Sequence, residues 1–251
     1  MAIIMILAGL LLPSLSQGKE RAKEVLCINN LRQIGISGKL LWDENDGKIR
    51  PLTGGRPALP GCWTETFGLP ESRSLYPYLK QSEVWRCPKD RGKYRVHCGL
   101  HTEAGLMPTC WETRGFSYEF NGGRPDGLRV PFTRREVASG IVGKLDSSIP
   151  NPTLFILMYE PPAALQACHC VPREHFRPRW YQWHRNRGKT QFLDPRLAPA
   201  QFYSPILFVD GHCKVFNFTK ALTTDPYYPF EETKDWMWYL AKGEVGVNQR
   251  Q

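Results

Sequence analysis

The first 46 residues constrain the fold more than any other part of the chain. An apolar run from Ala2 to Leu12 is followed by Pro13 and then by apolar residues at helical spacing. Asn45-Asp46-Gly47 is a natural helix stop, because glycine takes the left-handed conformation that ends many helices. Pro13 should kink the helix, since it removes one backbone donor and crowds the preceding turn. The pattern predicts a helix over residues 1–46, with an apolar anchor at 2–12 and an amphipathic stalk at 15–46, carrying residues 47–251 as a globular head.

Composition describes the rest of the chain only broadly. Hydrophobic residues make up 41% of the 251 residues and charged residues 23%, which is typical of a folded domain. The 22 glycines and 21 prolines are scattered, so we expect many turns and short elements after the first helix. A net charge of +9 permits nucleic acid, lipid head groups or acidic glycans as partners without choosing among them.

Short β-friendly runs predict a small antiparallel sheet in the head. Residues 116–120 and 153–159 are predicted strands. Residues 206–209 and 212–218 alternate around Asp210-Gly211, which predicts a hairpin with a type I′ turn. Other predictions are a helix or turn at 72–79, an extended piece at 83–87 and a short helix at 236–239 that packs on the head. We therefore expect an α+β fold with long irregular insertions.

The N-terminal stretch also carries a family resemblance. AIIMILAGLLLPSLSQGKERAKEVLCINNLRQIG followed by LLWDENDGK resembles the N-terminal region of the prepilin-type, pseudopilin-like proteins abundant in planctomycetes and verrucomicrobia. Further pieces recur downstream in the family's order: LYPYL (75–79), VWRCPKD (84–90), GFSYEFNG (115–122), a lone His184 and ILFVDGHCKVF (206–216). His184, Asp210 and Gly211 resemble the family's C-terminal His-to-Asp-Gly signature.

The chain departs from this family at its start and in the signature. The leader, the processing site and the glutamate near the mature N-terminus are missing, and Met1 falls where an interior residue of the membrane helix stands in the family. Residues 1–12 are shorter than the roughly 20 apolar residues that a spanning helix needs. Either the gene start is placed too late, which we favour, or the protein has lost the assembly signal. His184 and Asp210 lie farther apart than is usual, separated by an insertion rich in proline and arginine.

The resemblance implies a pilin-like fold and a non-enzymatic role. The chain would be a pseudopilin or minor pilin-like subunit of a type II secretion or type IV pilus-like filament. It would lie in the inner membrane, with its head in the periplasm or another extracytoplasmic space. Its partners would be other pilin subunits and the inner-membrane assembly platform. An apolar stripe and the proline after it would carry assembly: Ile3, Ile4, Ile6, Leu7, Leu10, Leu11 and Pro13.

Eight cysteines at irregular spacing favour disulfides in an oxidising compartment. Cys98 with Cys110 is one such pairing, and the family resemblance implies that Cys27 with Cys87 clamps the helix to the head. No cofactor is expected, but two metals stay open. Zinc would use His97, Cys98, His101, Cys110 and the run Cys168-His169-Cys170. Calcium would use Asp43, Glu44, Asn45 and Asp46, whose alternation is one residue out of step with a calcium loop.

Two other functions stay open. An extracytoplasmic membrane-anchored enzyme would use His184, Asp210 and His212 as an acid–base or metal site; the structural alternative is that Asp210-Gly211 makes the hairpin turn and His184 hydrogen-bonds near it. An adhesin or nucleic-acid binder would use the basic insertion at about 161–204, where arginine holds phosphate and tryptophan stacks on bases or sugars. Its candidate residues are Arg177, Arg179, Trp180, Trp183, Arg185, Arg187 and Lys189; the structural alternative is that the tryptophans pack on the head.

Overall fold

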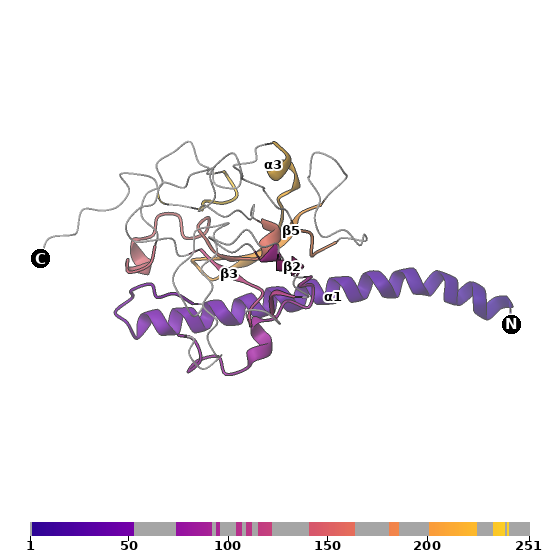
Figure 1. Cartoon of the computed structure of the whole chain (residues 1–251), viewed down its shortest axis with the longest axis horizontal. Coiled ribbons are helices and arrows are strands. Elements are labelled where there is room, and N and C mark those ends of the chain that lie inside the picture. Colours follow the sequence, from indigo (N-terminus) through magenta and orange to yellow (C-terminus); the bar gives the residue numbers. More distant parts are fainter. Residues whose placement is uncertain are drawn as a thin grey trace, which may run out of the picture.

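A long N-terminal helix dominates the computed structural model of the chain. The structure describes residues 2–52, 74–91, 94–95, 104–106, 109–111, 115–121, 141–163, 181–185, 201–224, 233–238 and 240. Helix α1 spans Ala2–Asp43 and continues through Pro13 without a break. Its first half projects from the head and its second half lies along it (Figure 1). Within the described residues, no helix has a stretch apolar enough over a sufficient length to cross a bilayer.

The second half of α1 is helical because one of its faces is buried. Cys27, Leu31 and Ile34 are fully buried, and Trp42 is nearly so, which is the spacing of one helix face. Helices gain most of their stability from packing such a face. The helix ends where Asp46 and Gly47 both take left-handed backbone angles, with φ of 57° and 72°. The predicted long helix and its stop are therefore confirmed.

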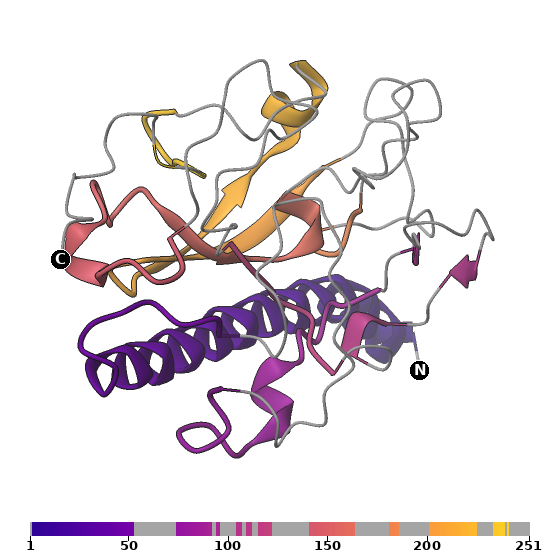
Figure 2. The same ribbon diagram turned by 60° about the vertical axis from the view of Figure 1, so that its left-hand side comes forward.

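The predicted antiparallel sheet is present above this half of the helix (Figure 2). Its strands are β3 (Glu119–Phe120), β4 (Ile156–Tyr159), β5 (Tyr203–Phe208) and β6 (Cys213–Asn217). They pair in the order β3-β4-β5-β6, all antiparallel, and fall within or beside the predicted runs. A separate antiparallel pair joins β1 (Tyr94–Arg95) to β2 (Ala104–Leu106). The fold is thus α+β.

The hairpin between β5 and β6 has a different turn from the predicted type I′. The backbone N–H of Gly211 donates to Phe208, and that of Phe208 donates to His212, so the loop has three residues. Gly211 takes a φ of +90°, whereas Asp210 has no positive φ. A three-residue loop with one left-handed glycine is the arrangement that ends in a G1 bulge. A type I′ turn needs two residues with positive φ.

Short helical elements complete the head. They are η2 (Ser82–Trp85), η3 (Asp146–Ser148), η4 (Pro161–Ala163) and α3 (Thr219–Thr224). The prediction of an extended piece at 83–87 was wrong, because Val84 and Trp85 bury their side chains from a 3₁₀ turn. Residues 74–78 form a turn, as predicted for 72–79.

The aromatic tail segment packs on the head without forming the predicted helix. Met237 bridges Phe155 in parallel, and its N–H donates to Leu154. Trp236 and Trp238 are buried on either side of it. The bridge and the backbone hydrogen bonds of Met237 attach this segment beside the beginning of β4.

The sheet separates two apolar clusters. On β5, Leu207 belongs to the cluster against α1, while Ile206 and Phe208 belong to the cluster on the opposite face. This alternation is the period of two that a strand imposes. The far cluster also holds Phe218 and Trp238.

Gly35 sets how closely α1 approaches the sheet. A Cβ atom added at Gly35 would lie 2.9 Å from Cδ1 of Leu207, which is itself fully buried. Gly18, on the projecting half of the same helix, has no atom within 4 Å of such a Cβ. The helix therefore needs glycine at position 35 for packing and not at position 18.

Replacing Gly35 with leucine should push α1 away from the sheet. We expect Gly35→Leu to lower the free energy of unfolding by about 1–3 kcal/mol, the usual cost of overpacking a core. Gly18→Leu is the matched control and should not lower it, because leucine is the better helix former. Chemical denaturation of both variants measures the difference. Equal effects from the two substitutions would contradict the close contact.

Candidate functional site

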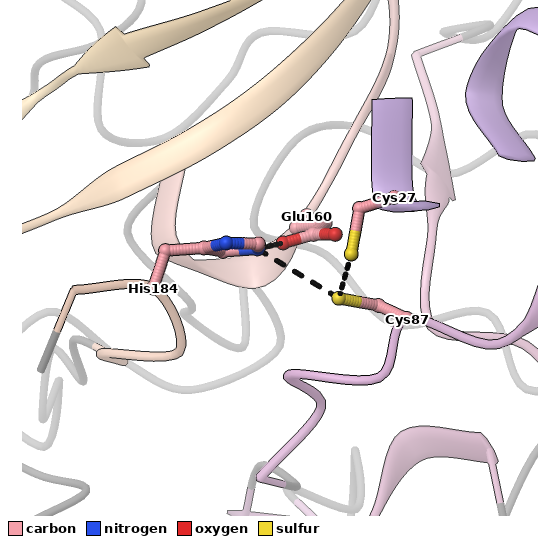
Figure 3. Close-up of side chains that lie close together, drawn as sticks. All are labelled: Cys27, Cys87, Glu160 and His184. Carbon is pink, nitrogen blue, oxygen red and sulfur yellow. Dashed lines mark hydrogen bonds and ion pairs between the residues drawn. The ribbon is translucent and has the colours of Figure 1, made fainter. Parts of the chain in front are cut away.

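Four chemically reactive side chains converge between α1 and the head (Figure 3). Cys27 lies on α1, Cys87 follows η2, Glu160 follows β4, and His184 lies in segment 181–185. Their ligand atoms all lie within 4.8 Å of one another, and all four residues are buried. We call this group the Cys-Cys-Glu-His cluster. It joins four segments that are far apart in the sequence.

A tight turn positions Cys87. The N–H of Asp90 donates to the carbonyl of Cys87 at 2.9 Å, and the N–H of Cys87 donates to Oγ of Ser117 at 3.1 Å. The N–H of Lys89 points back at the Cys87 sulfur, 3.3 Å away. The sulfur atoms of Cys27 and Cys87 are 2.7 Å apart.

Asp90 holds this turn against the neighbouring segments. Its carboxylate accepts the backbone N–H groups of Cys110 at 3.0 Å and Trp111 at 2.9 Å. It also accepts the hydroxyl of Ser117 at 2.6 Å. The position of the Cys87 sulfur is therefore fixed by several hydrogen bonds around it.

Glu160 and His184 form a fully buried pair. Glu160 directly follows the interior strand β4, and its N–H donates to Oγ of Ser204 at 3.3 Å. Its Oε2 lies 2.6 Å from Nε2 of His184, and that nitrogen lies 3.7 Å from the Cys87 sulfur. The second polar atom of each side chain, Oε1 of Glu160 and Nδ1 of His184, is buried without a hydrogen-bond partner in the described part of the chain.

The cluster shifts the pKa values of its members. Burial acts to lower the pKa of His184, but Glu160 and Cys27 together, through charge and hydrogen bonds, outweigh it and raise the pKa to about 10. Burial raises the pKa of Cys87 well above its usual value. Burial also acts to raise the pKa of Cys27, but hydrogen bonds with Cys87 and His184 outweigh it and lower that pKa. Cys27 is thus the thiol that ionises more readily.

Ion pairs surround the cluster and hold α1 to the head. Glu20 pairs with the buried Lys89. Glu24 accepts two hydrogen bonds from Arg185, at 2.8 and 3.1 Å, and that guanidinium lies 4.2 Å from the centre of the Tyr203 ring. Glu20, Glu24 and Cys27 stand three or four residues apart, so they share one face of the helix. Arg185 follows His184 directly and has a left-handed φ of 54°.

Of the cysteines predicted to form disulfides or bind zinc, some have described positions and others do not. Cys27 and Cys87 are adjacent, while a covalent bond between them stays a prediction. Cys110 is buried beside the Asp90 turn. The other members of the predicted zinc and disulfide sets, His97, Cys98, His101 and 168–170, lie outside the described residues.

His184 does not join Asp210 and His212. The N–H groups of Val209 and Asp210 donate to Phe155 and Pro152, at the beginning of β4, whereas Glu160 and its partner His184 lie beyond its end. Oδ1 of Asp210 lies 2.6 Å from Nδ1 of His212, outside the core. Neither the predicted three-residue acid–base site nor the predicted hydrogen bond between His184 and the hairpin is formed.

Two of the predicted anion-binding residues, Trp183 and Arg185, lie among the described residues. Trp183 is buried, as the alternative in which tryptophans pack on the head expects, and Arg185 is engaged by Glu24 and Tyr203. Arg177, Arg179, Trp180, Arg187 and Lys189 lie outside the described residues.

The predicted calcium residues have separate partners. Asp43 pairs with Lys39 at 3.1 Å, Glu44 accepts the hydroxyl of Tyr78, and the Asn45 amide donates to Leu41 at 2.7 Å. Asp43, Glu44 and Asn45 are thus each engaged by a different residue.

Glu160 is the member of the cluster that sequence reasoning missed. It comes directly after the apolar run ILMY and directly before two prolines. A carboxylate at the end of a buried strand is unusual, because burying a charge is costly unless it is paired. A glutamate directly after an apolar strand is therefore the sequence signal that could have identified Glu160.

Removing the charge of Glu160 should destabilise the fold. We expect Glu160→Gln to lower the free energy of unfolding by about 3–5 kcal/mol, because it removes one partner of a buried charged pair. Glu83→Gln is the control: Glu83 is exposed, and its 3.7 Å pair with Arg86 contributes about 0–1 kcal/mol. Urea denaturation of both variants tests this. A loss in Glu160→Gln no larger than in the control would refute the buried pair.

Comparison of the chain with protein-family models, with curated proteins and with solved structures gave no match. The family resemblance of the N-terminal stretch and of the downstream motifs therefore remains an expectation from the sequence.

Proposed function

We propose that this chain is a non-enzymatic, pilin-like subunit of a type II secretion or type IV pilus-like filament and assembles through α1. The chain would lie in the inner membrane, with its head in the periplasm or another extracytoplasmic space. Its partners are further pilin-like subunits and the membrane platform that assembles them.

One observation carries this proposal. The projecting half of α1 exposes large apolar side chains: Leu11 is 66% exposed, Leu12 65% and Leu15 71%. Large apolar side chains that are exposed together on one helix mark a surface that a partner can cover. From Cys27 onward, one face of the same helix is buried by the head. The second half of α1 thus packs on the head, and the first half would bind other subunits.

Assembly would be driven by the apolar ends of the helices. Each leucine transferred from water into a helix bundle contributes about 1.5–3 kcal/mol. The ion pairs of Glu20 and Glu24 with the head would keep the projecting helix at a fixed angle. The heads would then form the outer surface of the filament.

The two alternative functions have less support. The enzyme alternative requires His184 with Asp210 and His212, which lie at opposite ends of β4. The anionic-polymer alternative requires free arginine and tryptophan side chains, and Trp183 is buried while Arg185 is paired.

The projecting leucines should control self-association. We expect the double variant Leu11→Ser/Leu12→Ser to weaken self-association of the full chain by at least roughly a hundredfold, since two leucines supply about 3–6 kcal/mol. Sedimentation velocity over a concentration series, with electron microscopy of the pelleted material, measures this.

The matched control is Ile36→Ser/Leu40→Ser, which removes two exposed apolar side chains from the half of α1 that carries the head. It should assemble like the unmodified chain. An unmodified chain that stays monomeric at all concentrations, or a control that loses as much association as the test variant, would contradict assembly through the projecting half.

A further inference from the structure

We propose that the Cys-Cys-Glu-His cluster binds a divalent transition-metal ion of the zinc type, with Cys27, Cys87, Glu160 and His184 as its four ligands. This inference is independent of filament assembly. It concerns a set of residues different from the zinc set suggested by the sequence.

The donor set fits such an ion. Thiolate and imidazole are the ligands that zinc prefers, and carboxylate oxygen completes many of its sites. Four ligands from four segments satisfy the tetrahedral coordination of a structural zinc site, with no position left for substrate. The ligand atoms already lie within 4.8 Å of one another in a region closed to solvent.

Coordination of the ion requires two of the distances between ligand atoms to lengthen. Zinc–sulfur bonds of about 2.3 Å at the tetrahedral angle place two sulfurs about 3.8 Å apart. The Cys87 sulfur and His184 Nε2 are 3.7 Å apart, close to a tetrahedral edge. The two sulfurs, at 2.7 Å, must separate by about 1 Å. Nε2 of His184 must likewise move away from Oε2 of Glu160, at 2.6 Å.

The polar atoms around the cluster favour a metal over a simple disulfide. The sulfur separation of 2.7 Å lies between that of a disulfide, about 2.05 Å, and that of two zinc ligands, so it does not choose between them. A disulfide accounts for the sulfurs alone. It leaves a carboxylate and an imidazole buried beside a neutral bond, with Oε1 of Glu160 accepting no hydrogen bond from the described residues. A divalent cation uses all four groups.

The backbone supports thiolate at Cys87. The N–H of Lys89 points at its sulfur at 3.3 Å, and the turn that orients this N–H is itself held by Asp90. Hydrogen bonds of this kind stabilise the negative charge of a metal-bound sulfur. On binding, each thiol releases its proton to solvent, and His184 releases the proton on Nε2 so that this nitrogen coordinates the ion.

The full chain tests the proposal directly. We expect the purified protein, after gel filtration without chelator, to hold about one zinc per chain by inductively coupled plasma mass spectrometry. Cobalt exchanged into the site should give the visible absorption of a tetrahedral thiolate complex. Dialysis against a strong chelator should lower the melting temperature, and zinc, but not magnesium, should restore it. Zinc content below about a tenth of an equivalent overturns the proposal.

Thiol labelling separates the metal from a disulfide. The protein is unfolded in guanidinium with chelator and an alkylating reagent, without reductant, and its peptides are mapped. Metal ligands would both be alkylated, at Cys27 and at Cys87. Alkylation of these two residues only after reduction identifies a disulfide and overturns the metal site.

Ligand variants locate the ion. Cys27→Ser, Cys87→Ser and His184→Gln should each lose the bound zinc and the cobalt spectrum. The controls are Cys213→Ser and His212→Gln, which remove the same kinds of side chain outside the cluster and should keep both. Loss of zinc in the controls, or its retention in the Cys87→Ser variant, assigns the metal elsewhere and overturns the proposal.

Discussion

The burial of one face of α1 is the interaction on which the rest of the head depends. Leu31 and Ile34 are covered by the sheet, and Leu207 of β5 reaches the helix backbone at Gly35. Because the strands near the helix are only two to six residues long, they gain little stability as a separate sheet. The helix supplies the apolar surface on which they fold. Contact with α1, more than strand pairing, sets the position of the head.

The polar contacts of α1 affect the orientation of the helix, whereas its apolar packing sets how closely it approaches the sheet. One group of them lies near the point where the helix leaves the head, at Glu20, Glu24 and Cys27, and Lys39 pairs with Asp146 nearer its other end. Apolar packing alone fixes the depth of a helix but allows it to slide or turn. Charged pairs and the Cys-Cys-Glu-His cluster define a single rotation, because each requires one direction of one side chain. The angle of the projecting half therefore depends on these few polar residues.

Local sequence patterns predicted the parts of this fold that local physics determines. The helix, its stop at Gly47 and the strands at 153–159 and 206–218 follow from periodicity and turn residues. The turn type at Asp210-Gly211 was predicted wrongly, because the same dipeptide fits a two-residue and a three-residue loop and the pairing of Phe208 with His212 decides between them. The 3₁₀ turn at Val84 and Trp85 forms because both side chains are buried against the head. Tertiary packing, which local sequence does not show, decides this conformation.

The candidate site was only partly predictable for a related reason. Cys27 and Cys87 are 60 residues apart, and Glu160 and His184 are 24 apart, so no short spacing marks them as a set. His184 was linked to the Asp210 hairpin by family resemblance, but the antiparallel course of β4 carries Glu160 to the opposite end from that hairpin. Four ionisable groups thus meet in the buried core. Such a meeting costs free energy unless the groups neutralise one another or bind a cation in common. Glu160 and His184 neutralise each other, and the two thiols beside them provide the remaining ligands that a metal needs.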